Sequence, residues 1–362
     1  MQPRPELLTV PAAVHGSAPP SAGAVLDFSA SSNPLGPAAR AVAAARAADF
    51  GRYPEPGAAT LRAAIAGRFD VPPERVIVGN GSVELTWLLA LAYLERGDRA
   101  LVVGPTFAEY ARAARILGAT VEEWRASPDL AFQPDLAQIR AAMARVRPRL
   151  TFVCNPNNPT GTYFARHEIA RLIDAAPGIL VLDEAYVGFV EAAWDVRPLL
   201  ADARLVVLRS MTKDHALAGL RLGYALAAPA VAQALAAAQP PWSVNAAAQA
   251  AGLAALMQDE HVARGRTVAH EALAHLARGL RALGLTPLPS AANYCLVEVP
   301  DAARVAAALR ARGIWVRDCT SFGLPRHVRV AARPLPECDA LLAALAHVLP
   351  PTANPDRVEA LA

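Results

Sequence analysis

The stretch that decides the fold is residues 150–186, LTFVCNPNNPTGTYFARHEIARLIDAAPGILVLDEAY. It opens with a strand-like apolar run at Leu150–Cys154, continues through a helical stretch at Arg166–Ala175, and returns to an apolar run at Ile179–Leu182. Strand, helix and strand in this order predict two parallel strands joined by a helix. Both runs end in polar residues, and open α/β sheets bind their ligands at the carboxyl ends of the strands.

The same alternation extends outward on both sides of this unit. It predicts an α/β protein with a mostly parallel sheet that is covered by helices on both faces. The other predicted strands are Val76–Val78, Ala100–Val103, Leu205–Leu208 and Leu222–Leu226, and the other predicted helices are Glu84–Glu95, Ala108–Leu117 and Leu136–Arg145.

A different pattern follows a long helical stretch at Val244–Leu283 and predicts a small α+β domain. We predict an N-terminal arm at 1–50, extended over residues 1–36, a large domain at 51–260, a small domain at 261–349 that includes part of the arm, and a loose tail at 350–362. The elements predicted in the small domain are the strands Tyr294–Val299, Ile314–Arg317 and Val328–Ala331 and the helices Ala302–Arg312 and Pro336–Val348.

Composition excludes several classes of protein. Hydrophobic residues make up 54% of the 362 residues, yet no apolar run reaches the roughly 20 residues that a membrane helix needs. The four cysteines are scattered without a C-x-x-C pair, which favours reduced thiols in a cytoplasm and argues against a metal site. The net charge is +3, but the basic residues form no run, so nucleic-acid binding is not expected. We predict a soluble, cytoplasmic protein without membrane or nucleic-acid partners.

Lys213 is the only lysine among the 35 basic residues. Arginine replaces the charge of lysine but not its chemistry, because a guanidinium stays protonated and cannot form a Schiff base. Lys213 follows the strand predicted at Leu205–Leu208, in the sequence Arg209-Ser-Met-Thr-Lys213. The sole primary amine of a side chain therefore falls at the ligand-binding edge of the sheet.

Other polar groups fall at the same edge. A glycine turn, Gly79-Asn-Gly-Ser82, precedes a helix, the rigid turn Asn155–Gly161 follows one strand, and Asp183 ends the next. Taken alone, the glycine turn also fits a plain tight turn and Asp183 a helix cap. Together an amine, donors for a phosphate and a carboxylate for a pyridinium proton match the needs of pyridoxal phosphate.

With these motifs the sequence resembles the fold type I pyridoxal-phosphate enzymes of the class I/II aminotransferase superfamily, from Asp27 to about Leu345. The resemblance implies a seven-stranded type of sheet and pyridoxal 5'-phosphate as the cofactor. It implies that Lys213 binds the cofactor covalently and shuttles protons, and that Asp183 pairs with the ring nitrogen. Tyr186 is the third implied catalytic residue.

The resemblance also assigns contacts to the cofactor and implies a homodimer with a shared active site. Tyr53 is implied to reach the cofactor phosphate of the partner subunit. The remaining implied contacts are Asn158 and Tyr186 to the phenolate oxygen, Phe107 stacked on the ring, and Ser82, Val83, Ser210, Thr212 and Arg221 around the phosphate.

Within the superfamily the sequence is most similar to the branch of L-threonine-O-3-phosphate decarboxylase and histidinol-phosphate aminotransferase, so a phosphorylated amino compound is the implied substrate. Arg317 is implied to bind its phosphate, and Arg329 a carboxylate. Asn158, His15 and Asn33 are further implied substrate contacts.

We favour decarboxylation of threonine O-3-phosphate in cobalamin biosynthesis. The alternative is histidinol-phosphate aminotransferase, in histidine biosynthesis, or another class I/II aminotransferase. His15-Gly16 and Arg317-Asp-Cys319 favour the decarboxylase, although Ser17 and Ser31 depart from its pattern. The segment Lys213–Arg221 is closer to the aminotransferase.

Two other classes fit the sequence less well. A nucleotide-binding dehydrogenase needs a complete G-x-G-x-x-G fingerprint, which the glycine turn lacks, and it leaves Lys213 unexplained. A pyridoxal-phosphate sensor fused to a transcription regulator needs a DNA-binding domain, and residues 1–36 are too few for one.

Overall fold

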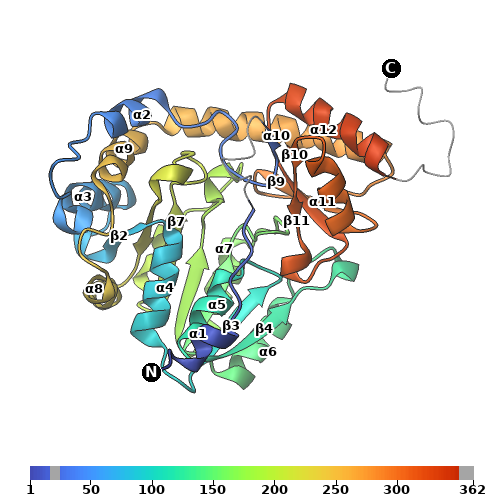
Figure 1. Ribbon diagram of the computed structural model, residues 1–362. Coiled ribbons are helices and arrows are strands. Elements are labelled where there is room, and N and C mark those ends of the chain that lie inside the picture. The colour runs from blue at the N-terminus through green and yellow to red at the C-terminus, as the bar shows by residue number, and fades with distance from the viewer. Residues whose placement is uncertain (17–24, 350–362) are drawn as a thin grey trace.

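A seven-stranded sheet forms the centre of the protein in the computed structural model, which describes residues 1–16 and 25–349 (Figure 1). The strand order is β2-β8-β7-β6-β5-β3-β4. Strand β8 is antiparallel to both neighbours, and the other pairs are parallel, so the prediction of a mostly parallel α/β sheet is confirmed. The strands are β2 (Val76–Asn80), β3 (Arg99–Gly104), β4 (Thr120–Arg125), β5 (Leu150–Cys154), β6 (Ile179–Asp183), β7 (Leu205–Ser210) and β8 (Leu222–Leu226).

Helices cover both faces of this sheet, which explains why its central strands are apolar throughout. In the strands other than β4, alternate residues enter two separate cores. In β5, for example, Phe152 packs in one core and Val153 in the other. One face carries α4 (Ser82–Tyr93), α5 (Glu109–Ile116) and α8 (Pro229–Ala238), and the other carries α3 (Ala59–Phe69), α6 (Leu136–Val146), α7 (Arg166–Ala175) and α9 (Ala246–Leu256).

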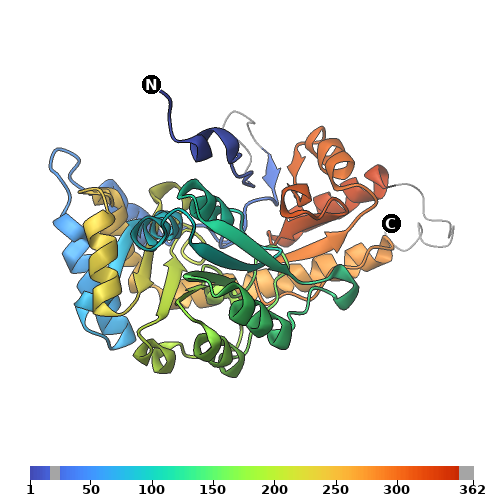
Figure 2. The same cartoon turned by 90° about the horizontal axis from the view of Figure 1, so that it is seen from below.

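The C-terminal part is a smaller α+β unit beside the large sheet (Figures 1 and 2). Its antiparallel sheet has the order β11-β12-β9 and packs with three helices around a third core. The N-terminal arm joins this unit through β1 (Leu26–Asp27), which pairs with β10 (Ile314–Trp315). The remaining elements of the unit are β9 (Tyr294–Glu298), β11 (Arg317–Asp318), β12 (His327–Ala331), α10 (Asp259–Ala282), α11 (Ala302–Arg310) and α12 (Leu335–Val348).

Short helices complete the chain. The arm holds α1 (Pro5–Thr9) and is followed by α2 (Ala39–Arg46), which packs on α9. Short 3-10 helices occur at η2 (Pro56–Ala58), η3 (Pro73–Arg75), η4 (Pro128–Leu130), η5 (Val187–Phe189), η6 (Arg197–Ala201), η7 (Ala218–Leu220) and η8 (Thr320–Phe322). Among the described residues, none of the helices combines the length and the apolar character needed to cross a membrane.

The structure corrects several predicted elements. The polar strand β4 was not predicted, because an edge strand with exposed side chains lacks the apolar signal. The helical stretch Val244–Leu283 is two helices, α9 and α10, and the predicted strand Ile314–Arg317 divides between two sheets. The arm is not extended throughout, since it contains α1. The predicted limit at 260/261 falls in the first turn of α10, and the domain limits stay predictions. Ser17 and the tail at 350–362 lie outside the described residues.

Candidate active site

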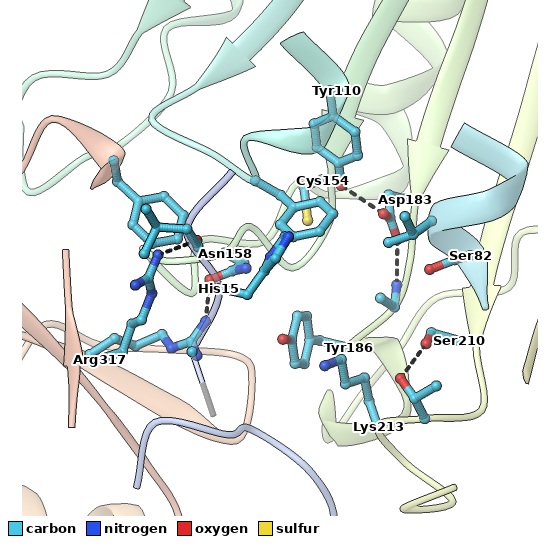
Figure 3. A pocket seen from close by; sticks show the side chains of 18 of the residues that line it. His15, Ser82, Tyr110, Cys154, Asn158, Asp183, Tyr186, Ser210, Lys213 and Arg317 are labelled. Atoms are coloured by element: carbon cyan, nitrogen blue, oxygen red, sulfur yellow. Dashed lines mark hydrogen bonds between the residues drawn. The ribbon is translucent and has the colours of Figure 1, made fainter. Parts of the chain in front are cut away.

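The carboxyl ends of β3, β5, β6 and β7 meet the small unit and the arm at a cavity of about 320 Å³ (Figure 3). This volume is within the range of small-molecule sites. Asn33 and Tyr53 are the two predicted site residues that do not line the cavity. The structure brings the other thirteen together in its wall: His15, Ser82, Val83, Phe107, Asn158, Asp183, Tyr186, Ser210, Thr212, Lys213, Arg221, Arg317 and Arg329.

Lys213 lies three residues beyond the end of β7, with its side chain in the cavity. Its ammonium nitrogen is 5.6 Å from the centre of the Tyr186 ring. Asn33 holds this segment from outside: its backbone N–H donates to the Lys213 carbonyl at 2.8 Å, and its side-chain amide donates to the Asp214 carbonyl at 2.9 Å. The structure therefore places Asn33 behind the lysine, where it is buried, and not among the groups that face the cavity.

Asp183 ends β6 in a buried position. Its two carboxylate oxygens accept hydrogen bonds from the Ala185 N–H at 2.9 Å and from the Tyr110 hydroxyl at 2.6 Å. Burial raises the pKa of the Asp183 carboxyl, and these two hydrogen bonds and the positive charge of Lys213 oppose the increase. Cys154 lines the same wall, and burial raises the pKa of its thiol to about 12.

Tyr110 lines the cavity and was not predicted from the sequence. It lies three residues after Phe107, on the first turn of α5. The only available signal was this helical spacing from Phe107, and a buried aromatic residue at such a spacing is equally typical of a core.

The opposite end of the cavity has the features of an anion site. The N-terminus of α4 begins there at Ser82, and the Ser210 and Thr212 hydroxyls are 2.7 Å apart. Gly81 has φ = 80°, a left-handed conformation that favours glycine, and a Cβ there would lie 2.7 Å from the Arg221 guanidinium. Helix N–H groups, hydroxyls and a guanidinium together suit a phosphate.

The rigid turn after β5 presents Asn158 to the cavity. Both Asn–Pro peptide bonds of this turn, Asn155–Pro156 and Asn158–Pro159, are cis. The side-chain amide of Asn157 donates to the Pro105 carbonyl at 2.9 Å, which ties this turn to the segment before Phe107. The Asn158 side-chain oxygen accepts a hydrogen bond from Arg329.

Arg317 and Arg329 form the wall that the small unit contributes. Both guanidinium groups are buried, and neither forms an ion pair within the described part of the chain. Arg317 donates to the Val14 carbonyl and to the Ser321 hydroxyl, each at 2.6 Å. Burial lowers the pKa of Arg317, and the charge of Arg329 lowers it further. Two buried cations without anions indicate an anionic ligand.

His15 brings the arm to the cavity. Its Nε2 is 3.1 Å from the Glu109 carboxylate, and its ring lies 5.7 Å from that of Phe107. The hydrogen bond with His15 lowers the pKa of Glu109, and a second one from the Trp87 indole N–H acts in the same direction.

Two aromatic residues, Tyr294 and Tyr53, lie outside the wall of the cavity. Tyr294 was not predicted: its buried ring lies 4.9 Å from the Arg329 guanidinium and 5.0 Å from the Tyr186 ring. Tyr53 lies outside the cavity, is 79% exposed and stacks on Trp242 at 4.5 Å. Ser31 is buried and does not line the cavity.

These residues fit pyridoxal phosphate as a group. Lys213 supplies the amine, and Asp183 is a buried carboxylate with no cation directly bonded to it among the residues that the structure describes. The anion site at Ser82, Ser210 and Arg221 lies across the same cavity, so one small molecule with an aldehyde, a basic ring nitrogen and a phosphate satisfies all three.

Comparisons with known proteins agree with this geometry. The sequence model of the aminotransferase class I and II family matches residues 23–345. The chain is 44% identical to the histidinol-phosphate aminotransferase of Symbiobacterium thermophilum over 82% of this chain and 83% of that protein, and 39% identical to that of Anaeromyxobacter sp. over 90% and 91%.

Solved structures show the same fold. The histidinol-phosphate aminotransferase of Sinorhizobium meliloti, in complex with pyridoxal-5'-phosphate, matches 88% of this chain and 89% of its own with a TM-score of 0.82 and 26% identity. A single mutant of the Thermus thermophilus aspartate aminotransferase matches 96% and 100% with a TM-score of 0.84 and 28% identity. The chain therefore belongs to the aminotransferase class I and II family, the fold type I enzymes that use pyridoxal 5'-phosphate.

Proposed function

We propose that this chain is a histidinol-phosphate aminotransferase, which moves the amino group of a phosphorylated amine to a 2-oxo acid. The relatives carry the choice of reaction, and the structural observation that supports it is the pair of buried guanidinium groups of Arg317 and Arg329, which face one cavity and have no ion pair in the described residues. One suits the phosphate of the amine, and the other suits the carboxylate of the acid.

The relatives favour amino transfer over decarboxylation. The curated proteins to which the chain is 44% and 39% identical carry the name histidinol-phosphate aminotransferase. They support the alternative predicted from the sequence, and the favoured prediction of threonine-phosphate decarboxylation in cobalamin biosynthesis gains no support from them.

Different residues of the cavity have different roles in amino transfer. When bound, pyridoxal phosphate supplies an aldehyde that bonds to amines and a ring that accepts electrons. Ser82, Ser210, Thr212 and Arg221 bind its phosphate, and Asp183 holds a proton at its ring nitrogen. Lys213 would take up at Nζ the proton that leaves the α-carbon of the amine and would deliver it to the former aldehyde carbon of the cofactor.

The small unit and the arm orient the two substrates in turn. Arg317 binds the phosphate of the amine through charge-assisted hydrogen bonds, with His15 beside it. Arg329 is held by the Asn158 side chain and the Ser29 carbonyl, and it presents its guanidinium to the carboxylate of the 2-oxo acid. Because histidinol phosphate carries no carboxylate, the two arginines serve the two halves of the reaction separately.

The test is a pair of assays on the purified holoenzyme. With histidinol phosphate and 2-oxoglutarate we expect glutamate to form, and with threonine O-3-phosphate alone we expect no carbon dioxide. Release of carbon dioxide without glutamate would replace the proposal with decarboxylation. Activity on unphosphorylated amino acids only would refute both and reduce Arg317 to a structural charge.

The proposal includes a cytoplasmic homodimer. Tyr53 is exposed and lies outside the cavity of its own chain, as expected of a residue that reaches the site of a partner subunit. All four cysteines are buried and free, which suits a reducing compartment.

A further inference from the structure

The Asp183 carboxylate accepts a hydrogen bond from a side chain that has no assigned role in amino transfer. One of its oxygens accepts from a backbone N–H of its own segment, but the other accepts from the Tyr110 hydroxyl, which comes from α5 (Figure 3). The 2.6 Å distance is typical of a charge-assisted O–H···O⁻ hydrogen bond. Tyr110 is thus the only side chain with a hydrogen bond to Asp183 in the described residues.

Two aromatic contacts fix the position of this hydroxyl. The Tyr110 ring is fully buried and lies parallel to that of Phe152, with centres 5.2 Å apart. It forms a T-shaped contact with the Phe107 ring, with the ring centres 5.5 Å apart. The same side chain therefore supports Phe107, which faces the cavity, and points its hydroxyl at Asp183. Burial raises the pKa of the Tyr110 hydroxyl well above its usual range, so this group stays protonated and acts as a donor.

We propose that Tyr110 is a positioning residue that acts through Asp183: its hydroxyl fixes the orientation of the carboxylate and favours its charged form. A buried carboxylate needs donors to remain ionised. A carboxylate that already accepts a strong hydrogen bond has a lower affinity for protons, so it leaves the proton on the ring nitrogen of the cofactor. The inference rests on the cofactor of the family and does not depend on which amine is the substrate.

The test is a double-mutant cycle on cofactor affinity. Apoenzymes of the wild type, Tyr110→Phe, Asp183→Asn and the double variant are titrated with pyridoxal phosphate, and the dissociation constant is read from protein fluorescence. Tyr110→Phe keeps the ring and removes only the hydroxyl. We expect it to weaken binding about tenfold in the wild-type background, as for the loss of a hydrogen bond to a charged group, and less than about twofold when Asp183 is already asparagine.

A matched control separates this effect from the loss of any buried hydroxyl. Tyr163 has a buried hydroxyl without a hydrogen-bond partner in the described residues, and it does not line the cavity. Tyr163→Phe should change cofactor affinity less than about twofold. The melting temperatures of the apoenzymes show that each variant is folded.

Kinetics supply a second readout. Tyr110→Phe should lower kcat for every amine while the KM of each substrate changes little, because Asp183 acts on the ring and not on the substrate. Equal losses of affinity from Tyr110→Phe in both backgrounds would show a merely structural role and overturn the proposal. Unchanged affinity in the wild-type background would overturn it as well.

Discussion

The two walls of the cavity are built in different ways. The cofactor wall, with Lys213, Asp183, Ser210 and Thr212, consists of residues at the ends of neighbouring strands in one sheet. Its polar groups form hydrogen bonds with protein side chains, as between Ser210 and Thr212 and between Tyr110 and Asp183. The substrate wall, with Arg317, Arg329 and His15, joins the arm to the small unit. Arg317 donates to the backbone carbonyl of Val14, and Arg329 donates to that of Ser29.

The charges of the two walls differ as well. The Asp183 carboxylate of the cofactor wall already accepts hydrogen bonds from groups of the protein itself. The guanidinium groups of Arg317 and Arg329 lack an anion among the described residues. A buried charge without its counterion costs several kcal/mol, so the substrate wall is completed only when an anion binds. Changes in the cofactor wall should therefore affect all substrates alike, and changes in the substrate wall should discriminate between them.

Lys213→Arg should have the largest effect, because arginine cannot replace the primary amine of the only lysine. We expect kcat to fall about 10³-fold or more with every substrate. Borohydride treatment of the wild-type holoenzyme followed by peptide mass spectrometry should find the cofactor on the Lys213 peptide alone. A labelled peptide without Lys213 would disprove this assignment.

Asp183→Asn should lower kcat about 10²-fold, since it removes the anion that stabilises charge at the ring nitrogen. The ratio of kcat/KM between histidinol phosphate and histidinol should stay within about threefold of the wild-type value, because the substrate wall is intact. A large change in that ratio would mean that the two walls are not independent.

The homodimer can be tested by mixing two inactive variants, Lys213→Arg and Tyr53→Phe. Random exchange of subunits makes half of the dimers hybrids, and each hybrid has one intact site of two, so activity should recover to about a quarter of the wild-type value. If exchange is demonstrated by mass and activity stays absent, Tyr53 does not act across the interface.

Glu109→Gln should have the smallest effect. It removes the charge that pairs with His15, a residue whose side chain is about half exposed, and such pairs contribute roughly 0–1 kcal/mol. The KM of the phosphorylated amine should rise about two- to fivefold, and the affinity for the cofactor should not change. Weaker cofactor binding in this variant would contradict the assignment of Glu109 to the substrate wall.

Much of the cofactor wall could be predicted because its information is local in sequence. Lys213, Asp183 and Asn158 each follow an apolar run within a few residues, and parallel strands bring their carboxyl ends to one edge. Tyr110 could not be predicted, since its spacing equally fits a core residue and its role depends on a partner 73 positions away.

The substrate wall depends on contacts between distant segments, so the sequence was less informative there. Asn33 was assigned to the substrate, yet its side chain binds the backbone 181 positions away, behind Lys213. Arg317 and Arg329 came only from the resemblance, because a single arginine in a short strand is usually a surface charge. Strand β4 was not predicted for a related reason: its exposed, charged residues interrupt the alternation of apolar and polar residues that indicates a strand.

The most direct test of the account is the selectivity for phosphate and its dependence on Arg317. The quantity to measure is kcat/KM for histidinol phosphate and for histidinol, with 2-oxoglutarate as acceptor, in the wild type and in Arg317→Gln. Charge-assisted hydrogen bonds contribute roughly 1.5–3 kcal/mol each, so the wild type should prefer the phosphorylated amine by about 100-fold or more. In Arg317→Gln the preference should fall below about tenfold, with cofactor affinity unchanged. An equal preference in both proteins would contradict the assignment of the two walls.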